Sequence, residues 1–398
     1  MLVLTEYGEG TVELSPEALQ RLRHRAGGRL RIAPGDAANR WIIGASSYVG
    51  TVVTPDLQVL IKPKVEIANL FLLLEASGRS LPLGPAVFDY ERSNDLVPAF
   101  ATFYAQHLET ALARGITRAY QERQHRLVGL RGRLDIPAQR RLAGLAAPVE
   151  CRYDEYSPDT QLNRLLLAAV SRLRRLPGVT VTTRQALQAL ATRLEGVGAV
   201  RPADLKTPTR FSRLDEHCRT AEHLARIVLQ SASVRNETGT AGAAEFLVDM
   251  NALFEAFLEA RLRRHLTRQL DIESQHPTTL DVGNRVRMKP DLVFRQRGEL
   301  VYVADSKYKL TTDGLGQGAD YYQLLAYIAA LNLQEGILIY CQHDGTLPPK
   351  EVLVRHLGKR LRTRAIRLDG TPADVEQQLR TLARDISNRV DTSGRQIA

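Results

Sequence analysis

Residues 288–310, MKPDLVFRQRGELVYVADSKYKL, alternate apolar and polar side chains on both sides of a short segment that contains a glycine. This period of two predicts a pair of antiparallel strands joined by a short turn. Three charged residues, Asp291, Asp305 and Lys307, occupy positions in this pattern that ought to be buried. Burial of a charge is costly unless the charge is paired or bound, so the presence of these three residues in the hairpin needs an explanation.

The register of this hairpin depends on its turn. We expect a three-residue loop at 297–299, in which Gly298 adopts the unusual backbone angles. Asp291 then lies directly opposite Asp305, with their Cβ atoms about 5 Å apart. Lys307 lies two residues beyond Asp305 and therefore shares its face. A two-residue turn would shift the register by one residue, so the pairing of the two aspartates rests on the length of the loop.

Two carboxylates at this separation repel each other, and one would stay protonated unless a cation lay between them. Carboxylate oxygens are hard ligands that suit Mg²⁺ or Mn²⁺. Lys307 could there orient a water or stabilise charge on a phosphorane-like transition state. Asp291 after Pro290, followed by Asp305-x-Lys307, is the pattern of PD-(D/E)xK nucleases. The alternative is a hairpin with two solvated aspartates and a surface lysine, since the pattern alone occurs by chance in many chains.

The segment upstream, residues 247–266, is expected to form an amphipathic helix. Its buried stripe contains Met250, Leu253, Phe254, Phe257 and Leu258. Glu255 lies at the edge of this stripe, from which it could lean towards the sheet and add a third carboxylate. The alternative is a surface glutamate in an i,i+4 series that runs through Glu259 to Arg263.

The segment downstream, residues 319–331, is also expected to be a helix, and it places Gln323 and Tyr327 on one face. An amide and a phenol there could hold the lysine, a metal-bound water or a DNA phosphate. The alternative is that Tyr327 packs in the core while Gln323 is solvated. The joint order of helix glutamate, Pro-Asp, Asp-x-Lys and Gln-x-x-x-Tyr favours an enzyme over either alternative.

The chain carries 54 Lys and Arg against 44 Asp and Glu, which gives a formal net charge of +10. Much of the excess is arginine in clusters such as RLRHRAGGRLR and GKRLRTRAIR. Guanidinium groups offer forked donors that suit phosphate, so nucleic acid is the favoured partner. An arginine-rich proteome is the alternative source of this signal.

Cys151, Cys218 and Cys341 lie far apart and form no C-x-x-C pair. This spacing argues against a disulfide framework, a zinc ribbon or an iron–sulfur site and fits a reducing cytosol. The first residues lack the basic and apolar regions of a signal peptide, and the longest apolar runs are too short to span a bilayer. We therefore expect a soluble, cytoplasmic protein without a membrane partner.

The length of 398 residues and the changes of pattern along the chain predict an α/β protein of several domains. Residues 1–90 are expected to form a β-rich partner-binding region, and residues 91–240 a mainly helical region that includes the basic segment RGRLD. Residues 241–398 are expected to form a restriction-endonuclease-like domain, a mixed sheet flanked by helices. The small, polar segment RNETGTAGAA at 235–244 is the best candidate for a boundary.

Motifs along most of the chain resemble the McrC family, the nuclease subunits of McrBC-type, modification-dependent restriction systems. The most specific similarity lies in the segments ADSKYK and DYYQLLAY. Further segments are similar in family order: LQVLIKPKVE, LRGRLD, SPDTQLNRLLLAAV, MNALFEAFL and MKPDLVF. The similarity covers roughly residues 40–345, and one departure from the broader superfamily is an aspartate at 305 where glutamate is commoner.

This resemblance implies a Mg²⁺- or Mn²⁺-dependent endonuclease that acts in antiviral defence on double-stranded DNA with modified bases. It implies a partner, a hexameric McrB-like AAA+ GTPase that the chain stimulates. The sequence has no G-x-x-x-x-G-K-[ST] segment, so the chain itself is not expected to bind or hydrolyse a nucleotide.

The resemblance also implies the residues of the site. The implied metal ligands are Asp291, Asp305, Glu255 and the carbonyl of Ser306. The implied catalytic set is Asp291, Asp305, Lys307 and Glu255, with Gln323 and Tyr327 in support. The candidate DNA contacts are Lys289, Lys309, Arg131 and Arg133, and the candidate partner contacts are Lys62 and Lys64.

Two other functions remain open at this point. A stand-alone RecB-like or Cas4-like repair nuclease would share Gln-x-x-x-Tyr, although the lack of a cysteine cluster removes the iron–sulfur subclass. A non-catalytic DNA-binding activator with a vestigial nuclease fold is the second. An intact set of two acids and a lysine argues against the activator, because an idle site has no need of charges on a buried face.

Overall fold

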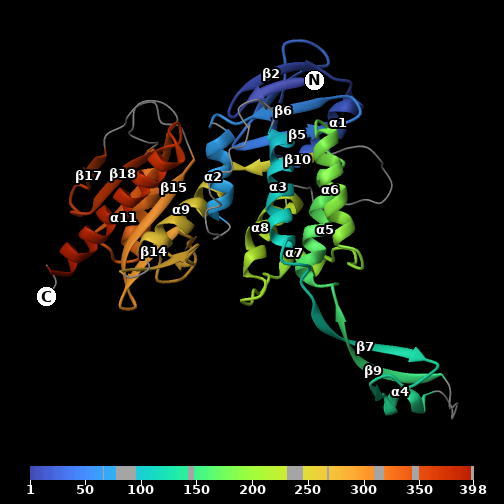
Figure 1. Cartoon of the computed structure of the whole chain (residues 1–398). Coiled ribbons are helices and arrows are strands. Elements are labelled where there is room, and N and C mark those ends of the chain that lie inside the picture. The colour runs from blue at the N-terminus through green and yellow to red at the C-terminus, as the bar shows by residue number, and fades with distance from the viewer. Residues whose placement is uncertain are drawn as a thin grey trace. The chain divides into compact units, whose positions relative to one another are not determined.

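The computed structural model describes residues 1–65, 67–77, 96–141, 148–230, 245–266, 269–308, 318–342 and 349–395. The chain divides into two compact units. Unit 1 comprises Met1–Leu96 and Ser231–Ala398, and unit 2 comprises Val97–Gln230. Helices and strands occur in both units, which confirms the α/β class (Figure 1). The division at residues 1–90, 91–240 and 241–398 stays a prediction.

The N-terminal part of unit 1 is built from two small sheets. One has the strand order β1-β6-β5-β10 and the other the order β2-β4-β3. The strands are β1 (Leu2–Thr5), β2 (Glu9–Glu13), β3 (Leu30–Pro34), β4 (Arg40–Ala45), β5 (Tyr48–Val53), β6 (Gln58–Lys62) and β10 (Glu245–Asp249). Their inward-facing side chains pack into one apolar cluster around Leu22, Ile43 and Val59. This cluster also contains Leu247, so a residue distant in sequence completes the N-terminal core.

Helix α1 (Pro16–Ala26) lies within the segment 1–90, which was expected to be β-rich. The hydroxyl of Ser15 caps its start by accepting a hydrogen bond from the Ala18 amide at 3.3 Å. Gly27, with a φ of 56°, ends it in the left-handed conformation that glycine adopts without strain. The arginine cluster of this segment is therefore in part the polar face of a helix, whose other face is buried.

Strand β10 corrects the predicted start of the next helix. Residues 247–249 were expected to be helical, but β10 pairs antiparallel with β5. Helix α9 (Met250–Leu266) begins only after Asp249, whose carboxylate accepts from the Asn251 amide at 3.0 Å. Phe246, Leu247 and Val248 are buried, so sheet pairing and burial outweigh the helical pattern of their sequence.

The C-terminal part of unit 1 is a six-stranded mixed sheet with the order β11-β14-β15-β16-β18-β17. The strands are β11 (Asp271–Ser274), β14 (Leu292–Gln296), β15 (Glu299–Lys307), β16 (Glu335–Gln342), β17 (Lys350–Leu353) and β18 (Arg360–Arg367). β15, β16 and β18 are mutually parallel, and the other pairs are antiparallel. A short separate ribbon joins β12 (Thr278–Thr279) to β13 (Arg287–Met288).

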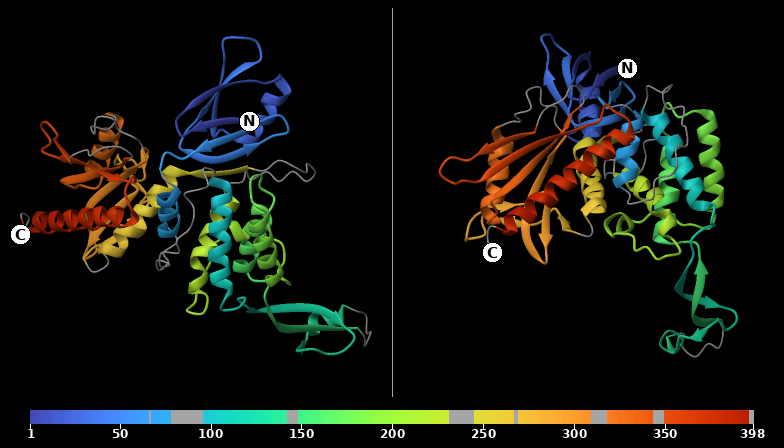
Figure 2. Two further views of the ribbon diagram at one scale, coloured as in Figure 1. Left: turned by 45° about the horizontal axis from the view of Figure 1, so that its top comes forward. Right: turned by 60° about the vertical axis from the view of Figure 1, so that its left-hand side comes forward.

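Helices cover both faces of this sheet (Figure 2). Helix α10 (Gly318–Ala330) packs Leu324 and Ile328 against Val293, Val303 and Leu338 on one face. Helices α9 and α11 (Pro372–Arg395) contact each other and lie on the other face. Helix α2 (Ile67–Ser77) packs against α9, and the buried Asn69 amide donates to the carbonyls of Leu368 and Gly370 at 2.8 and 2.7 Å.

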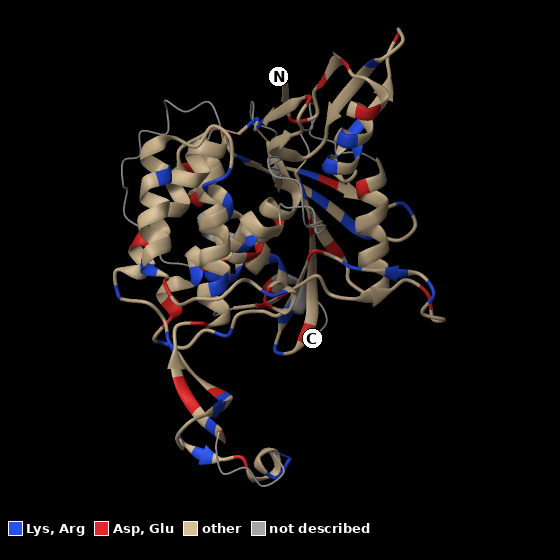
Figure 3. Ribbon diagram, turned by 90° about the vertical axis from the view of Figure 1, so that its right-hand side faces the viewer, with Lys and Arg blue, Asp and Glu red and all other residues tan. Residues whose placement is uncertain are grey.

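Unit 2 is a helical bundle with a long hairpin. Its helices are α3 (Leu96–Leu112), α4 (Ile136–Arg140), α5 (Gln161–Leu173), α6 (Val181–Arg193), α7 (Pro202–Lys206) and α8 (Arg219–Gln230), with a 3-10 turn at Glu216–Cys218. Its strands are β7 (Ala119–Leu127), β8 (Arg133–Leu134) and β9 (Val149–Ser157), in the order β7-β9-β8. Basic and acidic segments alternate along the hairpin (Figure 3), where Arg123 pairs with Glu155 and Arg126 with Glu150.

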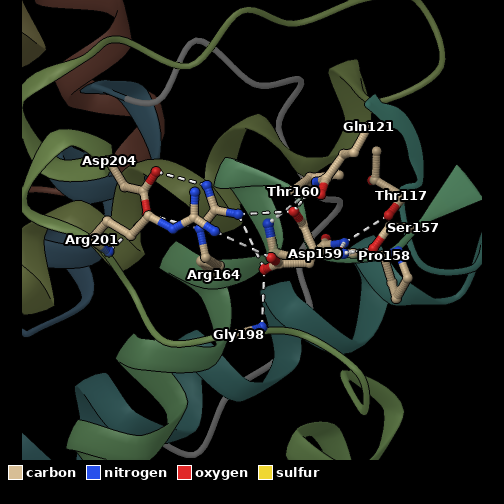
Figure 4. Close-up of polar contacts among 11 residues, drawn as sticks. Thr117, Gln121, Ser157, Pro158, Asp159, Thr160, Arg164, Gly198, Arg201 and Asp204 are labelled. Carbon is tan, nitrogen blue, oxygen red and sulfur yellow. Dashed lines mark hydrogen bonds and ion pairs between the residues drawn. The ribbon is translucent and has the colours of Figure 1, made fainter. Parts of the chain in front are cut away.

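A buried ion-pair network joins the base of the hairpin to the bundle (Figure 4). The guanidinium of Arg164 donates two hydrogen bonds to Asp204, at 2.8 and 2.9 Å, and one to Asp159 at 3.1 Å. The same oxygen of Asp159, Oδ1, also accepts a hydrogen bond from the Gly198 amide at 2.9 Å. Asn163, the residue before Arg164, donates through its side-chain amide to the carbonyls of Thr117 and Pro158 at 2.7 Å each. The start of α5 therefore holds the ends of both hairpin strands.

None of the described helices is both long and apolar enough to cross a membrane. Cys151, Cys218 and Cys341 are all buried and none of them forms a disulfide, as their spacing predicted.

We predict that Arg164→Leu destabilises the protein by about 3–5 kcal/mol, because it leaves the carboxylates of Asp159 and Asp204 buried without their cation. Arg201→Leu is the matched control, since the Arg201 side chain is 61 % exposed and its pairing with Asp159 is worth less than about 1 kcal/mol. Urea denaturation of both variants measures the difference. Equal effects of the two substitutions would contradict the role of Arg164.

Candidate active site

The β14–β15 hairpin has the predicted register but reaches it by a different turn. Arg297 and Gly298 form a two-residue turn, with φ values of 53° and 90°, so the expected three-residue loop is wrong. A bulge follows, because Arg295 pairs with Leu300 while Phe294 pairs with Tyr302. Val301 is the extra residue, and it restores the register that the shorter turn would have shifted.

The restored register brings the predicted acids to one side of the sheet. Leu292 pairs with Ala304 and Val293 with Val303, so the next positions in the register are Asp291 and Asp305. Asp305 therefore shares its face with Val303, under helix α10. Its neighbour on the parallel strand β16 is Leu338, which is fully buried.

Asp291 is held in place by the strand opposite. Its Oδ2 accepts hydrogen bonds from both the amide and the hydroxyl of Ser306, at 2.8 Å each. Its Oδ1 lies 3.4 Å from the amide nitrogen of Gln275. The same amide also donates to Glu255, so Gln275 joins the helix carboxylate to the strand carboxylate. Sequence reasoning missed Gln275, and the available signal was its place directly after β11, the strand that pairs with β14.

Asp305 is the most deeply buried of the predicted acids, with 1 % of its surface exposed. The ammonium of Lys307 lies 2.5 Å from its Oδ2. Its Oδ1 has no hydrogen-bond partner in the part of the chain that the structure describes. Burial and the nearby Asp291 raise the pKa of Asp305 to about 7, although Lys307 acts in the opposite direction. The site therefore holds a buried carboxylate with unused capacity to bind a cation.

The nearby carboxylates also shift the pKa values of Lys307 and Glu255. Burial acts to lower the pKa of Lys307, but the carboxylates of Asp305 and Asp291 outweigh it and the pKa lies above its usual value. Burial and the Asp291 carboxylate raise the pKa of Glu255, while the hydrogen bond from Gln275 lowers it. Glu255 is partly exposed, and Glu259 forms the expected i,i+4 ion pair with Arg263 at 2.8 Å.

The predicted pair on α10 also lies at this site. The amide of the exposed Gln323 donates to the hydroxyl of Tyr327 at 2.7 Å, and that hydroxyl lies 3.4 Å from the Lys289 carbonyl. Burial of Tyr327 and the nearby Asp305 raise its pKa. Tyr327 is 4 % exposed and packs in the core of the sheet, so its ring is structural while its hydroxyl connects Gln323 to the strand before Asp291.

The two aspartates are suited to a hard divalent ion. In the described ranges no three residues among His, Cys, Asp and Glu gather closely enough to hold a metal by themselves. Asp291, Asp305 and the Ser306 carbonyl would leave several positions for water, which is the coordination that Mg²⁺ prefers in proteins. The unpartnered Oδ1 of Asp305 agrees with such an ion, because a buried carboxylate oxygen is costly without a cation or a donor.

The remaining candidate residues lie elsewhere. Lys289 is exposed beside the site, and Lys309 lies outside the described residues. Arg131 and Arg133 are exposed on the hairpin of unit 2, where the Arg131 guanidinium stacks 4.1 Å from the centre of the Tyr153 ring. Lys62 ends β6, and the Lys64 ammonium lies 5.8 Å from the centre of the Tyr7 ring.

A cluster from the N-terminal sheet holds the residue that follows Lys307. The hydroxyl of Tyr308 donates to the buried Glu6 carboxylate at 3.2 Å, and the Tyr7 hydroxyl donates to the Tyr308 carbonyl at 3.0 Å. The Lys64 amide also donates to Glu6, at 2.7 Å. The end of β15, which carries Asp305 and Lys307, is thus fixed from both sides of Tyr308.

A family model described as "McrBC 5-methylcytosine restriction system component" matches residues 43–341. The chain belongs to this family. The resemblance to McrBC-type restriction systems that its motifs predicted is therefore confirmed. No curated protein matches the chain.

Two solved structures are similar to this McrBC family member. The first is a half-complex from a tetradecameric assembly of Thermococcus gammatolerans McrB AAA+ hexamers with bound McrC; it has a TM-score of 0.59 and 19 % identity over 97 % of this chain and 99 % of that one. The second, a Thermococcus gammatolerans McrBC complex, has a TM-score of 0.43 and 21 % identity over 67 % and 88 %. The first likeness shows that the fold extends over nearly the whole chain.

We predict that Glu6 makes the stability of this McrBC family member depend on pH. Burial raises its pKa from 4.5 to about 7, so the folded chain binds this proton more tightly than the unfolded chain does. The resulting stabilisation is complete below pH 4.5 and is lost as the pH rises through about 7. It amounts to about 3 kcal/mol, since one pKa unit is about 1.4 kcal/mol.

Glu6→Gln should remove this part of the pH dependence, while the exposed Glu13→Gln should leave it unchanged. Urea denaturation at about pH 5 and about pH 8 measures both. If Glu6→Gln and the wild type lose the same stability over this range, Glu6 is not the group responsible.

Proposed function

We propose that this chain is the nuclease subunit of an McrBC-type restriction system, a Mg²⁺- or Mn²⁺-dependent endonuclease with a PD-(D/E)xK domain in residues 241–398. Its substrate is double-stranded DNA that carries modified bases, in agreement with the 5-methylcytosine of the family description. The observation that carries the proposal is the buried Asp305, whose Oδ1 has no partner among the described residues, beside Asp291 and Lys307. A stand-alone repair nuclease would need the same chemistry but no partner.

Asp291, Asp305 and the carbonyl of Ser306 would hold the metal ion. When bound, the ion supplies Lewis-acid stabilisation of the negative charge on the phosphate and its leaving group. Ser306 prepares this site, because its amide and hydroxyl together fix Oδ2 of Asp291, while Oδ1 has only the longer contact of 3.4 Å with the Gln275 amide. Glu255 contributes through Gln275, which orients the Asp291 carboxylate from the opposite side.

Lys307 acts as a fixed positive charge. The adjacent carboxylates raise its pKa, so it remains protonated at neutral pH and can stabilise the additional charge that develops when water attacks a phosphodiester. Its ion pair with Asp305 limits the positions of the ammonium group. A preorganised cation of this kind lowers the barrier because it requires no reorientation during the reaction.

Gln323 and Tyr327 orient the site from helix α10. The Gln323 amide uses one hydrogen on Tyr327 and has a second available for a phosphate oxygen or a water. The buried ring of Tyr327 fixes the position of this amide. The pair supports binding of the substrate rather than the transfer of a proton, because the raised pKa of Tyr327 keeps its hydroxyl protonated.

A ring-forming AAA+ GTPase is the proposed partner. The structure that resembles this chain over nearly its whole length is described as containing McrB AAA+ hexamers with bound McrC. The present sequence has no G-x-x-x-x-G-K-[ST] segment, which agrees with hydrolysis of the nucleotide by the partner. Cleavage is then controlled by a partner that hydrolyses GTP, and this chain stimulates that hydrolysis.

We predict that Asp305→Ala and Lys307→Ala each lower DNA cleavage by at least about 10²-fold, because each removes an interaction with charge that develops in the transition state. The assay is Mg²⁺-dependent cleavage of a methylated plasmid in the presence of an McrB-like ring GTPase. Asp271→Ala, an exposed aspartate in the same sheet, is the matched control and should cleave normally.

A binding measurement separates the roles of the two residues. Asp305→Ala should lose binding of Mn²⁺ in calorimetry, whereas Lys307→Ala should keep it. Cleavage that survives both substitutions would refute the proposed site.

We also predict that the isolated chain hydrolyses no GTP and that adding it to the ring GTPase raises GTP turnover. Asp305→Ala should stimulate this turnover as well as the wild type does, because the substitution is confined to the nuclease site. Measurement of phosphate release tests both statements. GTP hydrolysis by the isolated chain would contradict the proposed division of activities, and failure to stimulate would favour the stand-alone nuclease.

A further inference from the structure

A basic hollow lies between the end of α5 and the start of α6 in unit 2. Its volume is about 580 Å³. Three arginines and three uncharged polar residues line it: Arg174, Arg175, Arg184, Ser171, Gln185 and Gln188. None of these residues belongs to the candidate active site, which lies in unit 1. The lining of the hollow contains arginines and uncharged polar residues but no carboxylate.

The turn RRLPGVT at 174–180 determines the positions of these arginines. Leu176 and Val179 are 1 % and 6 % exposed and anchor the turn in the bundle. Gly178 adopts a φ of 81°, which allows the chain to reverse after Pro177. Because the apolar residues of the turn point inward, the two arginines before them are left on the side that lines the hollow.

Arg184 is oriented across the hollow. Its guanidinium donates a hydrogen bond to the Leu176 carbonyl at 3.1 Å, so the first turn of α6 is joined to the turn before it. One bond uses only one of the five N–H donors of a guanidinium. The others remain available, and the positive end of the α6 dipole lies at the same end of the helix.

No carboxylate of the described residues neutralises the charge of the hollow. No aspartate or glutamate occurs from residue 160 to residue 194, although this stretch contains six arginines. Among the described residues, no carboxylate lies within ion-pair distance of Arg174, Arg175 or Arg184. The hairpin of the same unit differs, because Arg123 and Arg126 pair there with glutamates. Positive charge that is accessible and not paired within these residues is available to bind an anion.

We propose that this hollow binds the phosphodiester backbone of DNA, at a site separate from the one that cleaves it. Guanidinium forks and neutral amide or hydroxyl donors are the groups that contact phosphate in protein–DNA complexes. An acidic protein surface fits less well, since protein interfaces rely on buried aromatic and apolar anchors. The single apolar side chain at the rim, Val181, is 73 % exposed and forms no such anchor.

The proposal rests on the proposed function in one respect: a nuclease subunit makes DNA, rather than another polyanion, the ligand of the hollow. The hollow would hold DNA without regard to its sequence, because contacts to the DNA backbone fix its position and carry no sequence information. Recognition of a modified base is therefore no part of this site.

The test measures DNA binding and not cleavage, so its failure is distinguishable from failure of the nuclease site. The full chain carrying Arg174→Gln, Arg175→Gln and Arg184→Gln is titrated with a fluorescent duplex of about 30 base pairs in EDTA, by anisotropy. We expect affinity at about 0.1 M salt to fall by on the order of 10- to 100-fold. The slope of log affinity against log salt should become shallower by about 2 to 3, because each phosphate contact contributes about 0.9.

The matched control removes the same charge from the opposite end of the bundle. It carries Arg114→Gln, Arg210→Gln and Arg213→Gln, all three at exposed positions of unit 2. Arg193 at the end of α6 donates to the Leu112 carbonyl, and Gln161 at the start of α5 donates to the Thr207 carbonyl at 2.8 Å. Both bonds place the control region at the ends of α5 and α6 that lie away from the hollow. The control should bind DNA with nearly the wild-type salt slope.

A variant with a single substitution serves as the control in case the triple variant does not fold. Arg175 is exposed, so Arg175→Gln should keep the thermal midpoint of the wild type and lower the slope by about 1. Unchanged DNA affinity in the triple variant, or an equal loss in the control variant, would overturn the proposal. Loss of binding to the ring GTPase with DNA affinity intact would also overturn it and assign the hollow to a protein partner.

Discussion

The bulge at Val301 is the constraint on which the candidate active site depends. The two-residue turn at Arg297 and Gly298 alone would place Asp291 opposite Ala304 and turn Asp305 to the other face of the sheet. One extra residue in β15 reverses this outcome, because side chains of a strand alternate with a period of two. Asp291 can then accept both hydrogen bonds from Ser306 while Asp305 and Lys307 share the face beneath α10. The positions of both aspartates in the site follow from this register.

Burial of charge has opposite consequences in the two units. In unit 2 the guanidinium of Arg164 satisfies Asp204 with two bonds and Asp159 with one, so each buried charge has its partner. In unit 1 the Asp305 carboxylate is as buried, yet its Oδ1 has no partner among the described residues. A satisfied network stabilises one arrangement of the chain, whereas an unsatisfied carboxylate is a cost that a bound cation would remove. It is therefore the missing partner, and not burial, that distinguishes a binding site from a structural one.

Part of this arrangement could be predicted from the sequence. The alternation around Asp305 and the spacing of Gln323 and Tyr327 are local features, so the strands, the α10 helix and the shared face were predictable. The turn was not, because a two-residue turn with a bulge and a three-residue loop give the same register. β10 was missed for a different reason: its partner β5 is nearly 200 positions away, and only pairing across that separation makes residues 245–249 a strand. Gln275 was missed because the one signal for it, its place directly after β11, depends on the pairing of β11 with β14, which the local sequence does not indicate.

The arginines of this chain show why composition alone could not assign its DNA contacts. The net charge of +10 was the reason to expect nucleic acid, but arginines of equal formal charge occupy different environments. Those of the hairpin pair with glutamates across the strands, and Arg131 stacks on Tyr153. Arg164 is enclosed in the network that holds the hairpin. Counterion release depends on charge that the protein leaves available to phosphate, so pairing and not abundance determines which arginines bind DNA. By that criterion the carboxylate-free stretch of α5 and α6 is a stronger candidate than the more conspicuous clusters of the sequence.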